Sequence, residues 1–163
     1  MRRGLAASRN AAMEHAHCPI VAVTDDDCIP DHEWVRAIQD GFAAPDAPDA
    51  VTGRVLPWGP EEPGLYAVSS RTSEARRLYS GHVAPWLVGT GANLAIRQEC
   101  LARVGRYHEQ LGVGTPGRAG EDMDLLHRLL GQGARILYEP RAIVYHERKG
   151  RAQRLHSRQS YGY

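Results

Sequence analysis

The sequence is poor in the residues that define several large classes of protein. Only three of its 163 residues are cysteines, Cys18, Cys28 and Cys100, and they are widely spaced without a C-x-x-C pair. An odd, scattered set of this kind predicts reduced thiols in a cytoplasmic protein. It argues against a disulfide framework and against a cysteine-based zinc site.

Long apolar runs and an excess of charge of one sign are lacking too. No run approaches the roughly 20 apolar residues of a membrane-spanning helix, and the first residues lead into no signal-peptide core. We therefore expect no membrane span in this chain. The formal net charge of +1 at pH 7 provides no extended basic surface, which argues against a nucleic-acid partner. Contents of 42% hydrophobic and 24% charged residues are ordinary for one globular domain.

Helix-prone and strand-prone segments alternate along the chain, which is typical of an α/β protein. Four glycines and one proline fall within the ten residues 111–120, which predicts a mobile loop. We predict helices over 4–16, 32–42, 65–79, 98–104 and 122–130, and strands over 20–24, 51–56, 93–96, 135–138 and 142–145.

Three consecutive aspartates, Asp25, Asp26 and Asp27, follow the apolar run 20–23, with only Thr24 between them. That run is short and β-branched, which predicts a buried strand of a parallel sheet. Open α/β sheets bind ligands at the carboxyl ends of their strands, and oxygen ligands suit Mg²⁺ or Mn²⁺. A cation would also offset the repulsion between adjacent carboxylates. The triplet therefore predicts a metal site, and the alternative is an acidic turn that caps the helix beginning near His32.

A second acidic cluster, Glu121, Asp122 and Asp124, stands at the start of the helix 122–130. On a helix, Asp122 shares a face with the leucines three, four and seven positions later, so its carboxylate should point inward. Beside a glycine-rich loop it is a candidate general base. The alternative is that the helix dipole alone favours acidic residues in a first turn. For Glu121 we expect this stabilisation of the helix start, and for Asp124 we expect an ordinary ion pair with Arg128.

His146 ends the predicted strand 142–145. Alternation places Ala142, Val144 and His146 on one face of that strand, which carries His146 to a strand end that a ligand can reach. The imidazole is therefore a candidate metal ligand. The alternative is a histidine that only makes structural hydrogen bonds.

Together these segments resemble family 2 glycosyltransferases of the GT-A type. The resemblance covers residues 4 to about 148, with the motifs in the order and spacing of the family. It is carried by the segments 4–10, 24–34, 89–97, 104–107, 120–125 and 138–146. A lone D-x-D motif would be far less specific than this ordered set.

The resemblance implies a GT-A-like (Rossmann-like) fold with a mixed, mainly parallel sheet and flanking helices. It implies metal-dependent, inverting transfer of a sugar from a nucleotide-sugar donor to an acceptor hydroxyl that the sequence leaves unidentified. The cofactor would be Mn²⁺ or Mg²⁺. The expected location is the cytoplasm, with peripheral association with the membrane open for a full-length form.

The resemblance also implies roles for the acidic residues. Asp25 and Asp27 match the D-x-D positions, which hold the ribose side of the donor and the metal, and Asp26 is the alternative metal ligand. His146 matches a residue on the metal or diphosphate side. Asp122 matches the catalytic base, with Glu121 as its alternative.

Further residues match the donor-binding part of the family. Arg9 and Asn10 match a helix that flanks the nucleotide site. The small-residue segment Gly91, Ala92 and Asn93 matches the stretch beneath the donor sugar, where bulky side chains would block the cleft.

One departure from the family concerns the beginning of the chain. Relatives place two strands that grip the nucleobase ahead of the position of Gly4, so we expect residues 1–163 to form a single, partial GT-A domain with a tail over 149–163. This departure leaves open an inactive remnant that binds a nucleotide-sugar or a partner. The aspartates alone also fit a metal-dependent nucleotidyl- or phosphotransferase.

Overall fold

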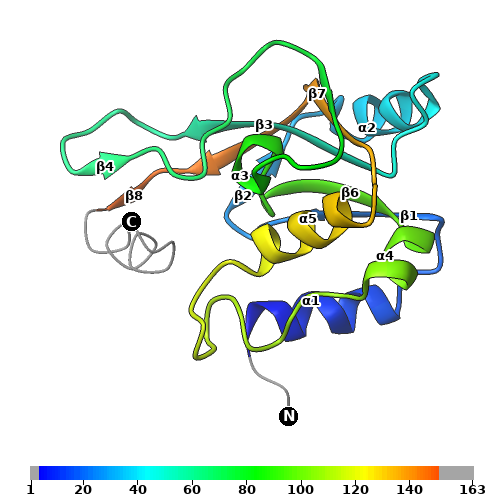
Figure 1. Cartoon of the computed structure of the whole chain (residues 1–163). Helices are drawn as coiled ribbons and strands as arrows, with labels where there is room; N and C mark the ends of the chain where they lie inside the picture. The colour runs from blue at the N-terminus through cyan, green and yellow to red at the C-terminus, as the bar shows by residue number, and fades with distance from the viewer. Residues whose placement is uncertain (1–3, 151–163) are drawn as a thin grey trace.

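The computed structural model describes residues 4–150, which form one mixed α/β unit (Figure 1). The helices are α1 Leu5–Glu14, α2 Trp34–Ala43, α3 Pro85–Val88, α4 Gln98–Val104 and α5 Glu121–Gly131. The strands are β1 Ile20–Thr24, β2 Cys28–Pro30, β3 Ala50–Trp58, β4 Leu65–Tyr66, β5 Arg77–Tyr79, β6 Asn93–Arg97, β7 Ile136–Glu147 and β8 Lys149–Gly150.

The main sheet has the order β1-β6-β3-β7-β2, with β5 also paired to β7. The mixed α/β class is confirmed, but the expectation of a mainly parallel sheet is wrong. Only the β3–β7 ladder is parallel among the described strands, and β1–β6, β3–β6, β2–β7 and β5–β7 are antiparallel. An apolar run reports burial on both faces of a sheet, whereas strand direction depends on connections that the run does not encode.

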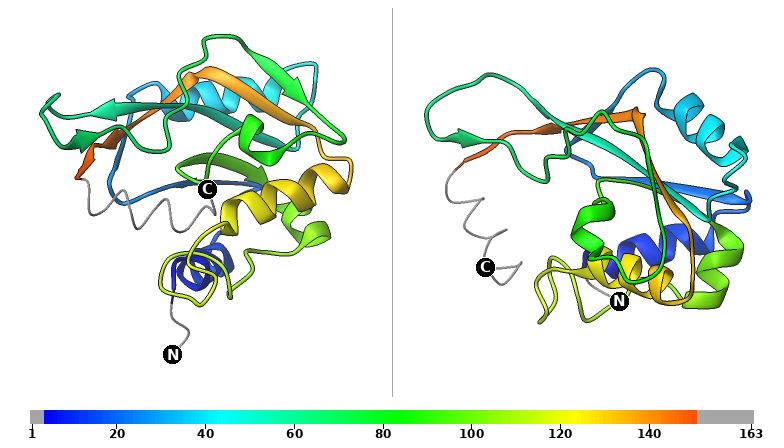
Figure 2. Two further views of the ribbon diagram at one scale, coloured as in Figure 1. Left: turned by 60° about the vertical axis from the view of Figure 1, so that its left-hand side comes forward. Right: turned by 45° about the horizontal axis from the view of Figure 1, so that its top comes forward.

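Helices cover both faces of the sheet, and each side has its own core. Helices α1, α4 and α5 lie on one side, where leucines of α5 pack with Leu94, Ile96 and Ile136 of the sheet. Helix α2 covers the other side through Trp34 and Ile38 (Figure 2). The amphipathic pattern of each helix therefore fixes which of its faces meets the sheet.

Strand β1 lies at an edge of the sheet. It pairs with β6 alone among the described strands, and four of its five residues are half-buried while Ala22 is exposed. The predicted strand 20–24 is therefore confirmed, but its full burial is not. The predicted helix 98–104 is present with the same ends. The other predicted strands and the helices near 4–16, 32–42 and 122–130 are present with shifted ends.

The predicted helix over 65–79 is wrong, because that segment consists of short strands joined by irregular chain. Strand β4 begins it, β5 ends it, and Arg71 exchanges two backbone hydrogen bonds of 2.9 Å with Val55 of β3. Backbone pairing with the sheet satisfies these groups better than a polar helix without an apolar face would.

Strand β7 unites the two short strands that the sequence predicts over 135–138 and 142–145. Its ladder with β3 shifts register between Gly53 and Arg54, where Glu139 and Ile143 are the successive partners. Pro140 lies in this irregularity and cannot donate a ladder hydrogen bond. A proline in the run therefore marks a bulge here and not the end of a strand. No helix within residues 4–150 is long and apolar enough to cross a membrane.

Candidate functional site

A cleft of about 130 Å³ opens where β1 ends and where α1 and α5 begin. Segments far apart in the sequence meet there, including the Asp25 turn, the stretch before β6 and the start of α5. The cleft is lined by Leu5, Arg9, Asp25, Ser69, Thr90, Gly91, Ala92, Val113, Ala119, Glu121 and Asp122. The two acidic clusters of the sequence therefore face one space, although about a hundred residues separate them.

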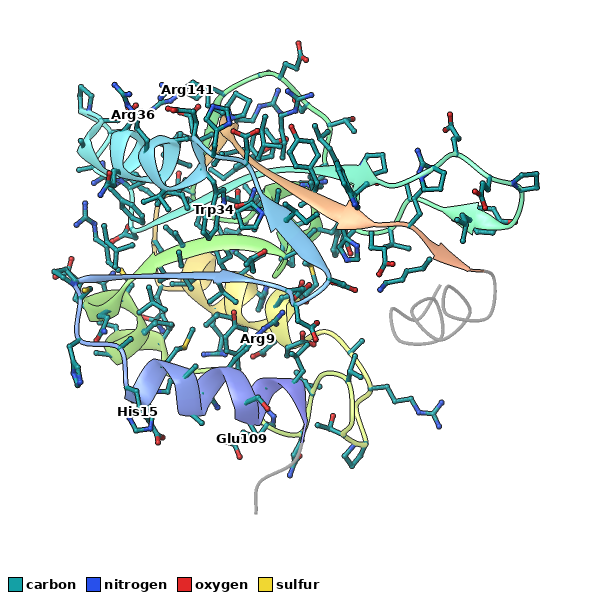
Figure 3. All side chains as sticks on the ribbon, turned by 180° about the vertical axis from the view of Figure 1, so that it is seen from behind. Arg9, His15, Trp34, Arg36, Glu109 and Arg141 are labelled. Atoms are coloured by element: carbon teal, nitrogen blue, oxygen red, sulfur yellow. The ribbon has the colours of Figure 1, made fainter. Side chains whose placement is uncertain are left out.

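Arg9 connects these clusters. It points from α1 toward the start of α5 (Figure 3). Its Nη1 group donates a hydrogen bond to Oε1 of Glu121, with 2.9 Å between the two atoms. The Nη2 group donates to Oδ1 of Asp25, and the guanidinium lies 5.3 Å from the centre of the Tyr107 ring. Because Arg9 is only 8% exposed, both ion pairs are held in a site largely withdrawn from water.

The carboxylates of the cleft outnumber this one cation. Burial alone would lower the pKa of Arg9, but Tyr107, Asp25 and Glu121 outweigh it and hold that pKa above its ordinary value. Burial, followed by the charge of Asp122, raises the pKa of Glu121 despite the opposing effect of Arg9. Three carboxylates, those of Asp25, Glu121 and Asp122, line the cleft beside this one guanidinium, so the cleft is rich in acidic groups.

Asp122 points inward, as its helix face predicts, and is 5% exposed. Its Oδ2 accepts the backbone N–H of Gly91 at 2.8 Å, and its Oδ1 accepts that of Met123 at 2.9 Å. These two bonds fix the carboxylate at the positive end of α5, where the helix dipole favours a negative charge. The ion pair expected between Asp124 and Arg128 is present at 2.8 Å.

The expectation that Glu121 merely stabilises the helix start is wrong. Its side chain is 6% exposed and paired with Arg9. Residue spacing along α5 did not reveal this, because the partner comes from α1 at the other end of the sequence.

A candidate metal site lies beside the cleft. Strand β2 pairs with β7 so that Cys28 lies opposite His146, which brings the aspartate turn to the end of β7. Ligand atoms of Asp25, Asp27, Cys28 and His146 all lie within 4.8 Å of one another. Asp25 belongs to both places, since it lines the cleft and faces this group.

The chemistry of the donor set favours three of these four residues. Nδ1 of His146 lies 2.9 Å from the carbonyl oxygen of Glu147. A proton on Nδ1 is donated to that carbonyl, which leaves Nε2, 3.6 Å from Asp27, free to bind a cation. Burial, Asp25 and Asp27 raise the pKa of Cys28 to about 11, so its protonated thiol is a poor ligand. Two carboxylates and an imidazole fit Mn²⁺ or Mg²⁺ with waters completing the shell.

Lys149 is the cation next to this group. Its Nζ lies 2.5 Å from Oδ2 of Asp27 and 3.4 Å from Oε2 of Glu147. Burial would raise the pKa of Asp27, but the hydrogen bond from Lys149 and the nearby His146 outweigh it and hold that pKa below its ordinary value. Asp27 is therefore ionised and ready to bind a cation at neutral pH.

The remaining sequence-predicted residues fall into two groups. Gly91 and Ala92 line the cleft, and a Cβ on Gly91 would lie 2.9 Å from Cβ of Asp122. The carboxamide of Asn10 is bonded to both backbone groups of Tyr107, and that of Asn93 to Trp34 and to two carbonyl groups. Both amides hold the walls of the site together. Asp26 is exposed and lies outside the four-residue group.

Sequence reasoning missed Lys149 and the aromatic neighbour of Arg9, Tyr107. Lys149 carries a signal that could have drawn attention, because it is the only lysine among the 20 basic residues of the chain. Tyr107 belongs to a recognised motif, but its packing against Arg9 has no local signal, because 97 positions separate it from Asn10, the residue after Arg9 in α1.

The fold and this site agree with comparisons to known proteins. The profile of "Glycosyl transferase family 2" matches residues 1–92, more than half of the chain. The chain thus belongs to glycosyl transferase family 2, and its fold is of the GT-A type. Among curated relatives, the pre-mycofactocin glycosyltransferase of Mycobacterium tuberculosis is 28% identical over 152 residues, which are 90% of this chain but only 31% of that protein.

Solved structures show the same fold at low sequence identity. The mannosyltransferase PcManGT from Pyrobaculum calidifontis, in complex with GDP-Man and Mn²⁺, has a TM-score of 0.63 at 19% identity, over 98% of this chain and 42% of that one. GalNAc-T7 with UDP, GalNAc and Mn²⁺ also has a TM-score of 0.63, at 16% identity, over 91% of this chain and 31% of that one. The chain therefore spans less than half the length of these relatives.

Proposed function

We propose that this chain carries the centre for metal-dependent, inverting transfer of a sugar from a nucleotide-sugar donor to an acceptor hydroxyl. The observation that carries the proposal is the position of Asp25, which lines one cleft with the inward-pointing Asp122 and also faces Asp27 and His146. A base and a candidate metal site thus share one space. Neighbours of the same fold that are bound to a nucleotide or nucleotide-sugar and Mn²⁺ support this proposal.

Asp122 is proposed as the general base. It takes the proton of the acceptor hydroxyl while that oxygen forms a bond to the anomeric carbon of the donor. The bond from that carbon to the diphosphate breaks in the same displacement, so the configuration inverts and the leaving group is a nucleoside diphosphate. The hydrogen bond from Gly91 and the helix terminus fix the position of the carboxylate that is proposed to accept this proton.

Asp25, Asp27 and His146 are proposed to hold Mn²⁺ or Mg²⁺, which would neutralise charge on the leaving diphosphate. Arg9 orients Asp25 and Glu121 and lines the cleft, so it is placed to contact an anionic part of the donor. Gly91 and Ala92 leave room for a sugar above them. The loop 111–120 reaches the cleft through Val113 and Ala119, and we propose that it closes over the acceptor and excludes water.

Residues 1–163 are proposed to act as part of a longer GT-A domain. The free cysteines support a cytoplasmic location, and Trp86, which is 56% exposed on α3, would suit peripheral contact of a full-length form with a membrane. An inactive remnant that retains donor binding is the second candidate. Measurement of sugar transfer by the wild-type chain separates the two candidates.

Metal and donor binding form the first part of the test. Calorimetry with Mn²⁺ and UDP, and separately GDP, compares the wild-type chain with Asp27→Ala and with the neighbouring Asp26→Ala. We expect Asp27→Ala to weaken Mn²⁺-dependent nucleotide binding at least tenfold and Asp26→Ala to leave it nearly unchanged. Equal binding by wild type and Asp27→Ala would show that Asp27 is not a ligand of the metal.

Transfer is the second part, measured as nucleoside diphosphate release from sugar nucleotides in the presence of a hydroxyl acceptor. Asp122→Asn keeps the size of the side chain but accepts no proton, so we expect a loss of about two to four orders of magnitude. Asp124→Asn is the matched control and should keep most of the rate. If Glu121→Gln abolished transfer while Asp122→Asn retained it, Glu121 would be the base. A wild-type chain that binds nucleotide without any transfer would identify the inactive remnant.

A further inference from the structure

A second, larger cavity of about 350 Å³ adjoins the cleft and has no role in the reaction described above. Ser69 lines the cleft and the next residue, Ser70, lines this second cavity, so one turn of chain separates the two spaces. The second cavity, here named the arginine cavity, is lined by Ser70, Arg71, Thr72, Ser73, Ala75, Arg77, Tyr79, Leu87 and Tyr138. Its volume suits a small molecule or one residue of a larger one.

The walls of the arginine cavity are fixed to the sheet. Arg71 is tied to β3 by its two backbone bonds with Val55. The Tyr138 hydroxyl of β7 donates to the carbonyl oxygen of Ser73 at 3.0 Å. The hydroxyl of Thr52 in β3 donates a hydrogen bond of 2.6 Å to the carbonyl oxygen of Val88, the residue after Leu87. The cavity is therefore a formed site and not a gap between loose loops.

The cavity has a positive lining. Arg71 and Arg77 contribute guanidinium groups, and no carboxylate lines the cavity within the described residues. The Nε of Arg71 is buried without a hydrogen-bond partner in that part of the chain. Burial raises the pKa of Tyr138, and the charges of Arg71 and Arg54 oppose this rise.

Neighbouring arginines outside the lining are paired, which makes the contrast informative. Arg54 lies 3.4 Å from Glu74, and Arg76 lies 2.9 Å from Asp46 and 3.4 Å from Glu139. Among residues 4–150, by contrast, Arg71 and Arg77 form no ion pair. Two such guanidiniums beside the hydroxyls of Ser70 and Thr72 are the donor set that binds a phosphate or a carboxylate.

We propose that the arginine cavity binds an anionic group, a phosphate or a carboxylate, of the acceptor whose hydroxyl reaches Asp122. This inference rests on the proposed function, because it needs the adjoining cleft to be the site of transfer. It restricts the acceptor to molecules that carry an oxyanion a short distance from the reacting hydroxyl. Leu87 adds one apolar contact beside that anion.

The test uses the complete 163-residue chain and two probes in parallel, inorganic phosphate and benzoate. Binding of each probe is measured by calorimetry and by NMR of the arginine Nε–H signals. Arg71→Gln should weaken binding of the preferred probe about tenfold to a hundredfold, since it removes charge-assisted hydrogen bonds. Arg36→Gln is the matched control, because Arg36 is exposed on α2, makes only a 3.9 Å contact with Glu33 and lines neither space. Preference for phosphate or for benzoate identifies which anion the acceptor carries.

Saturation of the chain with nucleotide and Mn²⁺ before the probe is added tests the acceptor assignment. An acceptor subsite must still bind the probe, so unchanged probe affinity supports the proposal, whereas competition would assign the anion site to the donor and overturn it. Binding of neither probe, or equal binding by wild type and Arg71→Gln, would also overturn it. Arg71-dependent binding in a chain that binds no nucleotide would instead refute the transferase function and with it the acceptor role, leaving only an anion site.

Discussion

The two acidic regions of the site neutralise their charge in different ways. On the base side, Arg9 is 8% exposed and its guanidinium holds Asp25 and Glu121 in fixed directions. On the metal side, the cation is Lys149, whose flexible side chain is 23% exposed and touches Asp27. A buried guanidinium is preorganised and costly to remove, whereas an ammonium near solvent is readily displaced. The base region, formed by Arg9, Asp25 and Glu121, is therefore rigid, whereas the metal side has a cation, Lys149, that a metal ion can replace.

Replacement of Arg9 should have the largest effect. Arg9→Met leaves the buried carboxylate of Glu121 and the half-buried carboxylate of Asp25 without their partner, so we expect the free energy of unfolding to fall by about 3–5 kcal/mol. Urea denaturation measures it. Arg106→Met is the matched control. Within residues 4–150 the ion pair of Arg106 is an exposed one with Glu14, so its loss should cost at most about 1 kcal/mol. Similar losses in both variants would contradict the rigid, buried character of the base region.

A methyl group placed in the base region should have the next largest effect. In Gly91→Ala the new Cβ would lie 2.9 Å from Cβ of Asp122 and 3.1 Å from Nη1 of Arg9, so we expect overpacking to cost about 1–3 kcal/mol. Gly131→Ala, where nothing lies within 4 Å, should be neutral or slightly stabilising. Thermal unfolding of both variants measures the difference in stability. Unchanged stability of Gly91→Ala would mean that the base region is not rigid.

On the metal side, removal of the cation should help a metal to bind. Lys149→Met takes away a competitor for Asp27, so we expect Mn²⁺ affinity to rise by up to about fivefold, the equivalent of an ion pair worth up to about 1 kcal/mol. Titration of Mn²⁺ followed by electron paramagnetic resonance measures it, with Arg36→Met as the control of equal charge. Weaker binding in Lys149→Met would show that Lys149 supports the metal site and is not exchanged.

The smallest expected effect is a difference in titration. The pKa of Glu121 is raised above its ordinary 4.5 by burial and Asp122, so stability from Glu121 is full below 4.5 and declines as the pH rises through its native pKa. The pKa of Asp27 is held below its ordinary 3.8, so its contribution is present above 3.8 and is lost as the pH falls through its native pKa. Carboxyl ¹³C NMR should find Glu121 titrating above Asp27 by more than their ordinary difference, and the reverse order would contradict the comparison.

The sequence predicted those parts of the molecule that depend on local pattern. The strand 20–24, the helix 122–130 and the inward direction of Asp122 follow from apolar periodicity, which burial against the sheet enforces. The segment 65–79 failed because its polar residues have no periodic apolar face, and its conformation depends on backbone pairing with β3 and β7. Strand direction failed for a related reason, since it is a property of the whole sheet.

The site shows the same division. Asp25 and Asp122 were placed in one cleft by the motif order, and the structure brings them together. The pairing of Arg9 with Glu121 and the approach of Lys149 to Asp27 join positions more than a hundred residues apart. Such contacts arise only when the β-ladders are assembled, so no spacing within a single segment encodes them.

The solitary lysine has a practical consequence. Reductive methylation with ¹³C-formaldehyde labels primary amines only, so it would mark Lys149 and the amino terminus of the chain and nothing else. A dimethylated amine keeps its positive charge and thus its attraction to Asp27. Its single NMR resonance, assigned by its loss in Lys149→Met, would shift when Mg²⁺ arrives and broaden when paramagnetic Mn²⁺ does. The chain therefore contains its own reporter of cation occupancy, which works without a known donor or acceptor.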